Sequence, residues 1–211
     1  MGARTRVLVG QEALTCVTCV LISIFFLIAI LINKEQRWRV ERQEQLLPTG
    51  TFKKLMAHER GFTGDKNAPY ILFEFGDYEC MPCHHAQSKV EALLKRCDGR
   101  IKISFFHLPL TQIHAFALPA ACFAEEQRRV GGTASFWNAH HKLYSEDSSQ
   151  LVSTSRARCS KLSKQVVDDD VKLAKELGIH GTPTFILCTP NREAYIIPLA
   201  EFPSFVEKVV Q

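Results

Sequence analysis

The chain has 211 residues and a formal net charge of +4, with 46% hydrophobic and 23% charged residues. A chain of this length and composition usually folds as one globular domain. The net charge is small and arises from mixed acids and bases, which excludes the strongly basic surface typical of nucleic-acid-binding proteins. We therefore expect no nucleic acid among the partners.

An apolar segment is the first predicted element. Residues 13–32 carry no formal charge and are rich in Ile, Leu, Val and Phe. At about 1.5 Å per residue, a helix of this length spans about 30 Å, the hydrocarbon core of a bilayer. No small-residue cleavage pattern follows it. We predict a short N-terminal flank at residues 1–12 and an uncleaved, single-pass transmembrane anchor at residues 13–33, with the lipid bilayer as a partner.

Two criteria disagree about the orientation of this anchor. More Lys and Arg residues follow the apolar segment than precede it, which by itself places the rest of the chain in the cytoplasm. Cys16 and Cys19 lie within the segment, however, and the other six of the eight cysteines follow it. Lasting disulfide chemistry belongs to oxidising compartments. We therefore favour the extracytoplasmic, periplasmic side for the main domain.

Residues 34–60 are predicted to form a charged stalk or linker. Lys, Arg, Glu and Gln are dense from residue 34 to 47, and Pro48-Thr49-Gly50 is a helix stop signal. Acidic residues are interspersed with the basic ones, so a solvated stalk is a better interpretation than a lipid-binding segment. The main domain then covers residues 61–211.

The main domain begins with the pattern of a β-α-β unit. Residues 70–75 form a short apolar run bounded by turn residues, as in a buried strand. The apolar residues at positions 90, 93, 94 and 97 share one helical face, and Asp98-Gly99 ends that helix. Residues 101–106 predict a second strand, which should pair in parallel with the first.

Helices dominate the middle of the domain. We predict helices over residues 112–129, 133–144 and 166–177, which together make a helical insertion at about 108–178. Strand patterns return at residues 184–187 and 193–197, separated by the turn Pro190-Asn191, and predict a hairpin. An amphipathic helix at residues 204–210 closes the chain.

Cys80 and Cys83 lie where the first strand turns into its helix. Two thiols separated by two residues can close a small disulfide ring, and a helix N-terminus stabilises a thiolate. The pair therefore predicts a redox centre. No second pair of spaced cysteines is visible, so zinc is disfavoured, and the cycle needs no metal or organic cofactor.

The same residues also fit another motif. Cys80-Met81-Pro82-Cys83-His84 matches the C-x-x-C-H attachment pattern of a c-type haem, with His84 as axial ligand. The only methionines are Met1, Met56 and Met81, so no downstream methionine can be the second axial ligand. A histidine could still serve, and this alternative stays open.

Several motifs in a fixed order resemble one known family. They are the run Asn-Ala-Pro-Tyr-Ile-Leu-Phe-Glu-Phe-Gly-Asp-Tyr-Glu-Cys-Met-Pro-Cys at 67–83, Phe-His-Leu-Pro-Leu at 106–110, Phe136-Trp137, and Gly-Ile-His-Gly-Thr-Pro-Thr-Phe at 178–185. From about Gly61 to Gln211 the chain resembles the DsbA-like thiol–disulfide oxidoreductases. This resemblance implies an α/β, thioredoxin-like fold whose helical insertion separates a β-α-β half from a β-hairpin-helix half.

The resemblance also implies roles for individual residues. Cys80 is the exposed nucleophile, with its pKa lowered from about 8.5 into the range of roughly 3.5 to 7.5. Cys83 is the buried resolving thiol. Glu74, inside the apolar strand, is a buried acid that relays the proton of Cys83. Thr182-Pro183 is a cis-proline loop that faces the pair and binds an extended client segment.

The dipeptide Met81-Pro82 lies between the cysteines and is expected to contact clients. Many DsbA-like proteins carry proline directly after the first cysteine, whereas here Pro82 directly precedes the second. This dipeptide adjusts thiolate stability and hence the reduction potential. The direction of catalysis, oxidase or reductase and isomerase, is therefore left open by the sequence.

These features together predict a protein-disulfide oxidoreductase. Its partners would be cysteine-containing secreted or membrane proteins and a separate membrane redox partner that recharges the pair. The alternative is a non-catalytic thioredoxin-like binding module in which Cys80 and Cys83 form a structural link. The sequence leaves open a second, structural disulfide among the remaining cysteines of the domain, Cys97, Cys122, Cys159 and Cys188, for which three complete pairings exist.

Overall fold

The computed structural model describes residues 3–145, 153 and 159–210, with no account of the side chains of residues 3–19, 41 and 44. The chain divides into two compact units, Met1–Gln45 and Leu46–Gln211. Residues 1–2 of the predicted flank, and 146–152 and 154–158 of the predicted insertion, lie outside the described residues. The boundary between the units lies fifteen residues before the predicted one at 60/61.

The first unit is one helix, α1 (Ala3–Glu44). It continues without a break from the apolar segment into the charged residues that follow, and its large apolar side chains between Val20 and Ile32 are exposed. In the part of the chain that the structure describes, no helix is both long and apolar enough to cross a membrane. The transmembrane anchor predicted at residues 13–33 is not supported.

The segment predicted as the end of the stalk belongs to the second unit. Helix α2 (Thr51–His58) buries Leu55 completely, and Phe52 and Met56 pack against the same core. These three residues follow the spacing of one helical face, whereas Lys53 and Lys54 lie on the other side. The stalk prediction for this part was wrong because it took the charged residues as the sign of a solvated linker, whereas they form the exposed side of an amphipathic helix.

The second unit is built on a five-stranded sheet with the order β1-β3-β2-β4-β5. Its strands are β1 (Thr63–Gly64), β2 (Tyr70–Gly76), β3 (Ile101–His107), β4 (Thr184–Cys188) and β5 (Ala194–Ile197). Strands β2 and β3 are parallel, whereas β4 pairs antiparallel with both β2 and β5. The predicted β-α-β unit and the predicted hairpin are confirmed. Strand β1, only two residues long, was not predicted.

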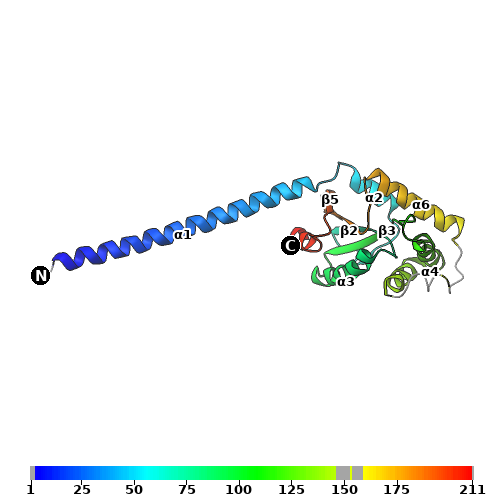
Figure 1. Ribbon diagram of the computed structural model, residues 1–211, viewed down its shortest axis with the longest axis horizontal. Coiled ribbons are helices and arrows are strands. Elements are labelled where there is room, and N and C mark those ends of the chain that lie inside the picture. The colour runs from blue at the N-terminus through cyan, green and yellow to red at the C-terminus, as the bar shows by residue number, and fades with distance from the viewer. Residues whose placement is uncertain (1–2, 146–152, 154–158, 211) are drawn as a thin grey trace. The chain divides into compact units, whose positions relative to one another are not determined.

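Helices cover both faces of this sheet (Figure 1). Alternate residues of β2 point to opposite faces, so Phe73 and Phe75 join Leu55 of α2 and Leu173 of α6 (Lys161–Glu176) in one core. The other face carries Leu72 and Glu74 and is covered by α3 (Met81–Arg96) and the C-terminal helix α7 (Ser204–Val210). The mixed sheet between two helical layers is the thioredoxin-like α/β fold that the sequence predicted.

In the described part of the helical insertion lie α4 (Ala117–Ser145), with a kink at Gly132, where φ is 72°, and α6. The helix predicted from residue 112 begins five residues later. The preceding loop is held instead by side chains of the redox-site turn: Asp77 accepts the backbone N–H of Leu110, and Glu79 accepts that of Phe116. A disulfide joins Cys122 of α4 to Cys159 just before α6, which is one of the pairings that the sequence left open.

A buried group of charges connects the insertion to the sheet. Asp170 of α6 accepts hydrogen bonds from the Arg60 guanidinium and, at 2.9 Å, from the backbone N–H of His107. Glu125 of α4 accepts from His107 Nε2 at 2.9 Å and from Arg128.

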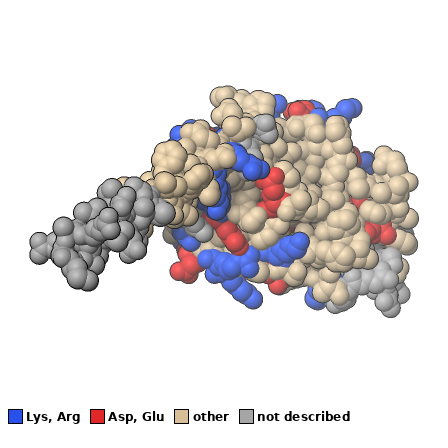
Figure 2. Space-filling model, turned by 60° about the vertical axis from the view of Figure 1, so that its left-hand side comes forward, with Lys and Arg blue, Asp and Glu red and all other residues tan. Residues whose placement is uncertain are grey.

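At the surface, basic and acidic side chains lie beside one another on the face shown in Figure 2.

Candidate redox site

The two cysteines lie at the N-terminus of α3, directly after the turn that follows β2. Asp77 shapes this turn, because its side chain accepts the N–H of Glu79 at 2.8 Å and its carbonyl accepts the N–H of Cys80 at 3.1 Å. Cys80 is the N-cap residue, and its carbonyl accepts the N–H groups of Cys83 and His84 at 2.9 and 3.1 Å. The sequence placed the pair correctly at a helix N-terminus.

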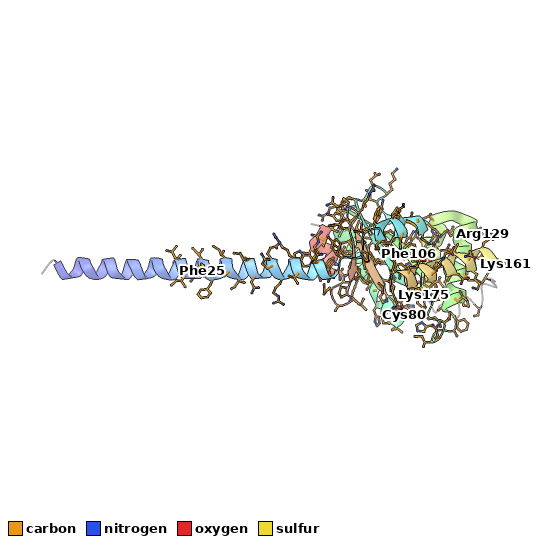
Figure 3. The ribbon with its side chains drawn as sticks, turned by 90° about the horizontal axis from the view of Figure 1, so that it is seen from above. Phe25, Cys80, Phe106, Arg129, Lys161 and Lys175 are labelled. Carbon is orange, nitrogen blue, oxygen red and sulfur yellow. A yellow bond between two sulfur atoms is a disulfide. The ribbon has the colours of Figure 1, made fainter. Side chains whose placement is uncertain are left out.

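The two sulfur atoms differ in how far they are covered. Cys80 is 5% exposed and Cys83 is 0% exposed, and both are free thiols. Cys80 is therefore the more accessible of the two cysteines. It is nevertheless buried, whereas an exposed nucleophile was predicted. The covering comes from the loop of Thr182, whose carbonyl oxygen lies 3.4 Å from the Cys80 sulfur. Figure 3 shows Cys80 near the periphery of the second unit, away from the interior residue Phe106.

Hydrogen bonding and burial move the pKa values of the two thiols in opposite directions. The hydrogen bond from Cys83 is the largest of the effects that together lower the pKa of Cys80 to about 5, against the opposing effect of burial. Burial raises the pKa of Cys83, and the contact with Cys80 and the charge of Glu74 raise it more. One thiolate and one thiol are the pair that disulfide exchange needs.

The Thr182-Pro183 loop faces this pair as the resemblance implied. The Thr182–Pro183 peptide bond is cis, and Pro183 is buried. The Thr182 carbonyl accepts a hydrogen bond from the Cys80 thiol, so this acceptor is occupied while Cys80 is protonated. Because a thiolate has no proton to donate, ionisation of Cys80 releases the carbonyl for another donor.

Met81 and Pro82 occupy the first turn of α3, and both are exposed. Met81 is 62% exposed, next to the nearly covered Cys80. Proline is tolerated in this first helical turn because its missing N–H has no partner there in any case. The position of the dipeptide leaves Met81 accessible to a polypeptide that approaches Cys80.

Glu74 lies beneath the pair and is 1% exposed. Burial raises its pKa to about 8, and a hydrogen bond from Gln87 opposes that rise. Gln87 Nε2 donates to Glu74 Oε1 at 3.0 Å. The sequence indicated the burial of Glu74 but missed Gln87, which follows Cys83 by four residues and therefore shares its helical face.

His84 does not have the free ring nitrogen that an axial haem ligand needs. Its Nδ1 lies 2.9 Å from the Tyr144 carbonyl oxygen, and its Nε2 lies 2.7 Å from that of Tyr78. Both ring nitrogens thus face backbone acceptors in this conformation, which argues against the c-type haem alternative. Among the described residues, no cluster of three or more His, Cys, Asp or Glu side chains is arranged to hold a metal ion.

A second histidine near the site was not predicted. His114, in the loop before α4, lies 2.7 Å from Asp77 Oδ2, and this hydrogen bond raises the pKa of His114. The same carboxylate oxygen accepts the N–H of Leu110. Asp77 therefore couples the turn that carries Cys80 to the loop that leads into the insertion.

Comparison with known proteins agrees with this geometry. A family model described as "Thioredoxin" matches residues 56–194. Among curated relatives, a Na(+)/H(+) antiporter NhaA 1 of Salinispora arenicola is 28% identical over 139 residues, which is 59% of this chain but only 21% of the antiporter. "Disulfide bond formation protein D" of Bacillus subtilis is 26% identical over 145 residues, 57% of this chain and 64% of that protein. The chain thus spans about a fifth of the first of these relatives and under two thirds of the second.

Solved structures share the fold. The crystal structure of Pseudomonas aeruginosa DsbA2 superposes with a TM-score of 0.59 at 19% identity, covering 72% of this chain and 92% of that one. At this level of identity the likeness concerns the arrangement of helices and strands. It confirms the predicted order of a β-α-β half, a helical insertion and a hairpin half.

Proposed function

Because the chain belongs to the thioredoxin family, we propose that it is a thiol–disulfide oxidoreductase that works through Cys80 and Cys83. The observation that carries this proposal is the opposed ionisation of the two sulfurs, with the pKa of Cys80 lowered to about 5 and that of Cys83 raised. A purely structural disulfide needs neither a stabilised thiolate nor a buried acid beneath it.

The reaction proceeds by two displacements. In the oxidising direction, a client thiolate attacks the sulfur of Cys80 in the Cys80–Cys83 disulfide, and Cys83 leaves as a thiolate that takes a proton. A second client thiolate then attacks the client sulfur of the mixed disulfide, and Cys80 leaves as a stable thiolate. The client loses two electrons and gains a disulfide, while the protein pair is reduced to a thiolate and a thiol.

Glu74 is the group that we assign to proton transfer at Cys83. With a pKa of about 8, its carboxyl group is mostly protonated at neutral pH and can give its proton to the Cys83 thiolate. In the reverse direction the carboxylate takes that proton back, so that Cys83 can attack the mixed disulfide on Cys80. Met81, Thr182 and Pro183 would hold the client segment beside Cys80.

The favoured direction is oxidation of clients. Contacts that stabilise the Cys80 thiolate stabilise the reduced pair, and a stable reduced form makes the corresponding disulfide a stronger oxidant. The Cys83 hydrogen bond to Cys80 acts in this sense. A stabilised Cys80 thiolate therefore favours an oxidase, although the position of Pro82 left the direction open in the sequence.

The partners and the location are also proposals. Clients would be cysteine-containing secreted or membrane proteins, and a separate membrane redox protein would reoxidise the pair. The Cys122–Cys159 disulfide supports an oxidising, extracytoplasmic setting for the domain, because lasting disulfides are rare in the cytosol. The exposed apolar side chains of α1 are the one observation that supports contact of this helix with lipid.

The reduction potential of the Cys80–Cys83 pair tests the proposal directly. Equilibration with defined glutathione buffers should give a value above roughly −220 mV, in the range of oxidising thioredoxin relatives. A value below about −300 mV, typical of structural disulfides, would favour the binding-module alternative.

A trapping experiment assigns the roles of the two sulfurs. The Cys83→Ala variant should accumulate mixed disulfides with clients on Cys80, whereas Cys80→Ala should accumulate none. In the Cys83→Ala background, Cys97→Ala is a matched control, because Cys97 is a buried free thiol outside the site. Its loss should leave the amount of trapped client unchanged. Adducts that form on Cys83 in the Cys80→Ala variant would contradict the assignment.

A further inference from the structure

A buried hydrogen-bonded chain continues beyond Glu74 into the helical insertion. Gln87 Nε2 lies 3.0 Å from Glu74 Oε1, and Gln87 Oε1 lies 3.3 Å from His140 Nε2. The other ring nitrogen of His140, Nδ1, lies 3.2 Å from the Tyr78 hydroxyl. None of the four residues is more than 8% exposed. The chain thus joins β2, α3, α4 and the turn before Cys80.

The direction of each hydrogen bond follows from the chemistry of the groups. Burial lowers the pKa of His140 well below its usual value, so the imidazole is neutral and carries one N–H. Burial likewise keeps the Tyr78 hydroxyl protonated by raising its pKa. The hydroxyl donates to Nδ1, and the proton of the ring is then on Nε2, where it donates to the Gln87 carbonyl oxygen. The Gln87 amide must then turn its NH₂ group towards Glu74.

We propose that Tyr78 and His140 are positioning residues that fix the orientation of the Gln87 amide, so that its N–H points at Glu74 and keeps this acid able to exchange the proton of Cys83. The proposal rests on the oxidoreductase function proposed above. The described hydrogen bonds of the Tyr78 and His140 side chains do not include one to a sulfur. They act on Cys83 only through Gln87 and Glu74.

The opposite orientation of the amide would have a clear disadvantage. With the Gln87 oxygen turned to Glu74, the carboxyl group would have to stay protonated to donate to it. His140 would then carry its proton on Nδ1 and donate to Tyr78, whose own hydroxyl proton would lose its acceptor in the chain. A buried donor without a partner is unfavourable, so the chain as built favours the orientation that stabilises the carboxylate of Glu74.

A cavity borders this chain on the side of α3 and α4. Glu74, Gln87 and His140 line a cavity of about 400 Å³, together with Trp137 and His141. The other charged or titratable groups around the chain are Cys83, Glu91 and Lys95 on α3, Arg128, Glu125, His141 and Tyr144 on α4, His107 on β3 and Asp170 on α6. None of these groups makes a described hydrogen bond to the Glu74 side chain, whereas Gln87 does.

The test reads the titration of Glu74 itself, in reduced full-length protein labelled with ¹³C at the Glu side-chain carboxyl carbon. Gln87→Leu removes the donor and should move the Glu74 midpoint upward by about one pH unit. His140→Phe should move it upward by about half a unit, because the amide is then free to turn. His141→Phe is the matched control: His141 is the next residue, half-exposed and outside the chain, and its loss should leave the midpoint unchanged.

The double variant separates an indirect effect from a direct one. In a Gln87→Leu background, His140→Phe should cause no additional shift, because His140 acts through Gln87. An equal shift in both backgrounds, or no shift in either, would overturn the proposal. Since the titration does not depend on client turnover, a protein without exchange activity would leave this result unaffected, and the two proposals fail separately.

The unaltered protein offers an independent measurement in case a variant does not fold. ¹⁵N-labelled histidine reports the tautomer of His140, and the chain requires a neutral ring with its proton on Nε2 and a bare Nδ1. A neutral ring protonated on Nδ1, or a charged ring at neutral pH, would refute the assigned direction of the hydrogen bonds.

Discussion

Replacing Glu74 by Gln should stabilise the protein at neutral pH while it impairs exchange. Burial raises the pKa of Glu74 from 4.5 to about 8, so the folded state holds a proton that the unfolded state releases above pH 4.5. The contribution of Glu74 to stability is therefore fully present below pH 4.5 and is lost as the pH rises towards 8. From these two pKa values, the wild type should lose about 2–3 kcal/mol between pH 5 and pH 7 through this one group.

Urea unfolding of both proteins at pH 5 and pH 7, in the same redox state, measures this difference. Gln has the shape of Glu and keeps an oxygen that can accept from Gln87, and any packing effect of the substitution cancels when the two pH values are compared. The free energy of unfolding of the Glu74→Gln variant should therefore fall less steeply with pH than that of the wild type. Parallel pH dependences for the two proteins would show that Glu74 is not held with a raised pKa and would remove the basis for proton transfer to Cys83.

Four further outcomes are expected. The rate of Cys80 alkylation by iodoacetamide should follow a thiolate with a midpoint near pH 5, and a midpoint near pH 8.5 would contradict the stabilising contacts. Replacing Cys122 and Cys159 together by Ala should lower the free energy of unfolding by about 3–4 kcal/mol, because the disulfide closes a loop of sequence separation 37. The same double variant should leave the redox pair's potential unchanged, which equilibration with glutathione would check. Asp170→Asn should cost about 3 kcal/mol in urea unfolding, since it removes the nearer of the two buried carboxylates that pair with the Arg60 charge, and a cost below about 0.5 kcal/mol, usual for surface changes, would refute that role.

The strands and the main helices could be predicted because their signals are local. The strand predicted at residues 70–75 is observed as Tyr70–Gly76, and the one predicted at 101–106 as Ile101–His107. Both strands are apolar runs between turn residues, which is the pattern that a strand buried on both faces requires. The placement of the cysteine pair followed from the same pattern.

The features that were missed depend on contacts between distant segments. The disulfide partner of Cys122 is decided by the packing of α4 against α6, which no spacing in the sequence reveals. The His140–Gln87 contact joins residues 53 positions apart. The accessibility of Cys80 was overestimated for the same reason, because the Thr182 loop that covers it lies 102 residues further along the chain.

Strand β2 separates two tasks that evolution or an engineer could adjust independently. Its odd-numbered side chains, Phe73 and Phe75, serve an apolar core shared with α2 and α6, whereas Glu74, directed to the opposite face, serves the sulfur chemistry. Apolar substitutions in the core cluster that contains Leu55 and Leu173 should therefore change the thermal stability of the protein without altering the surroundings of Cys83. Because the two faces of this seven-residue strand are separate, the stability of the fold and the reactivity of the cysteine pair can change independently.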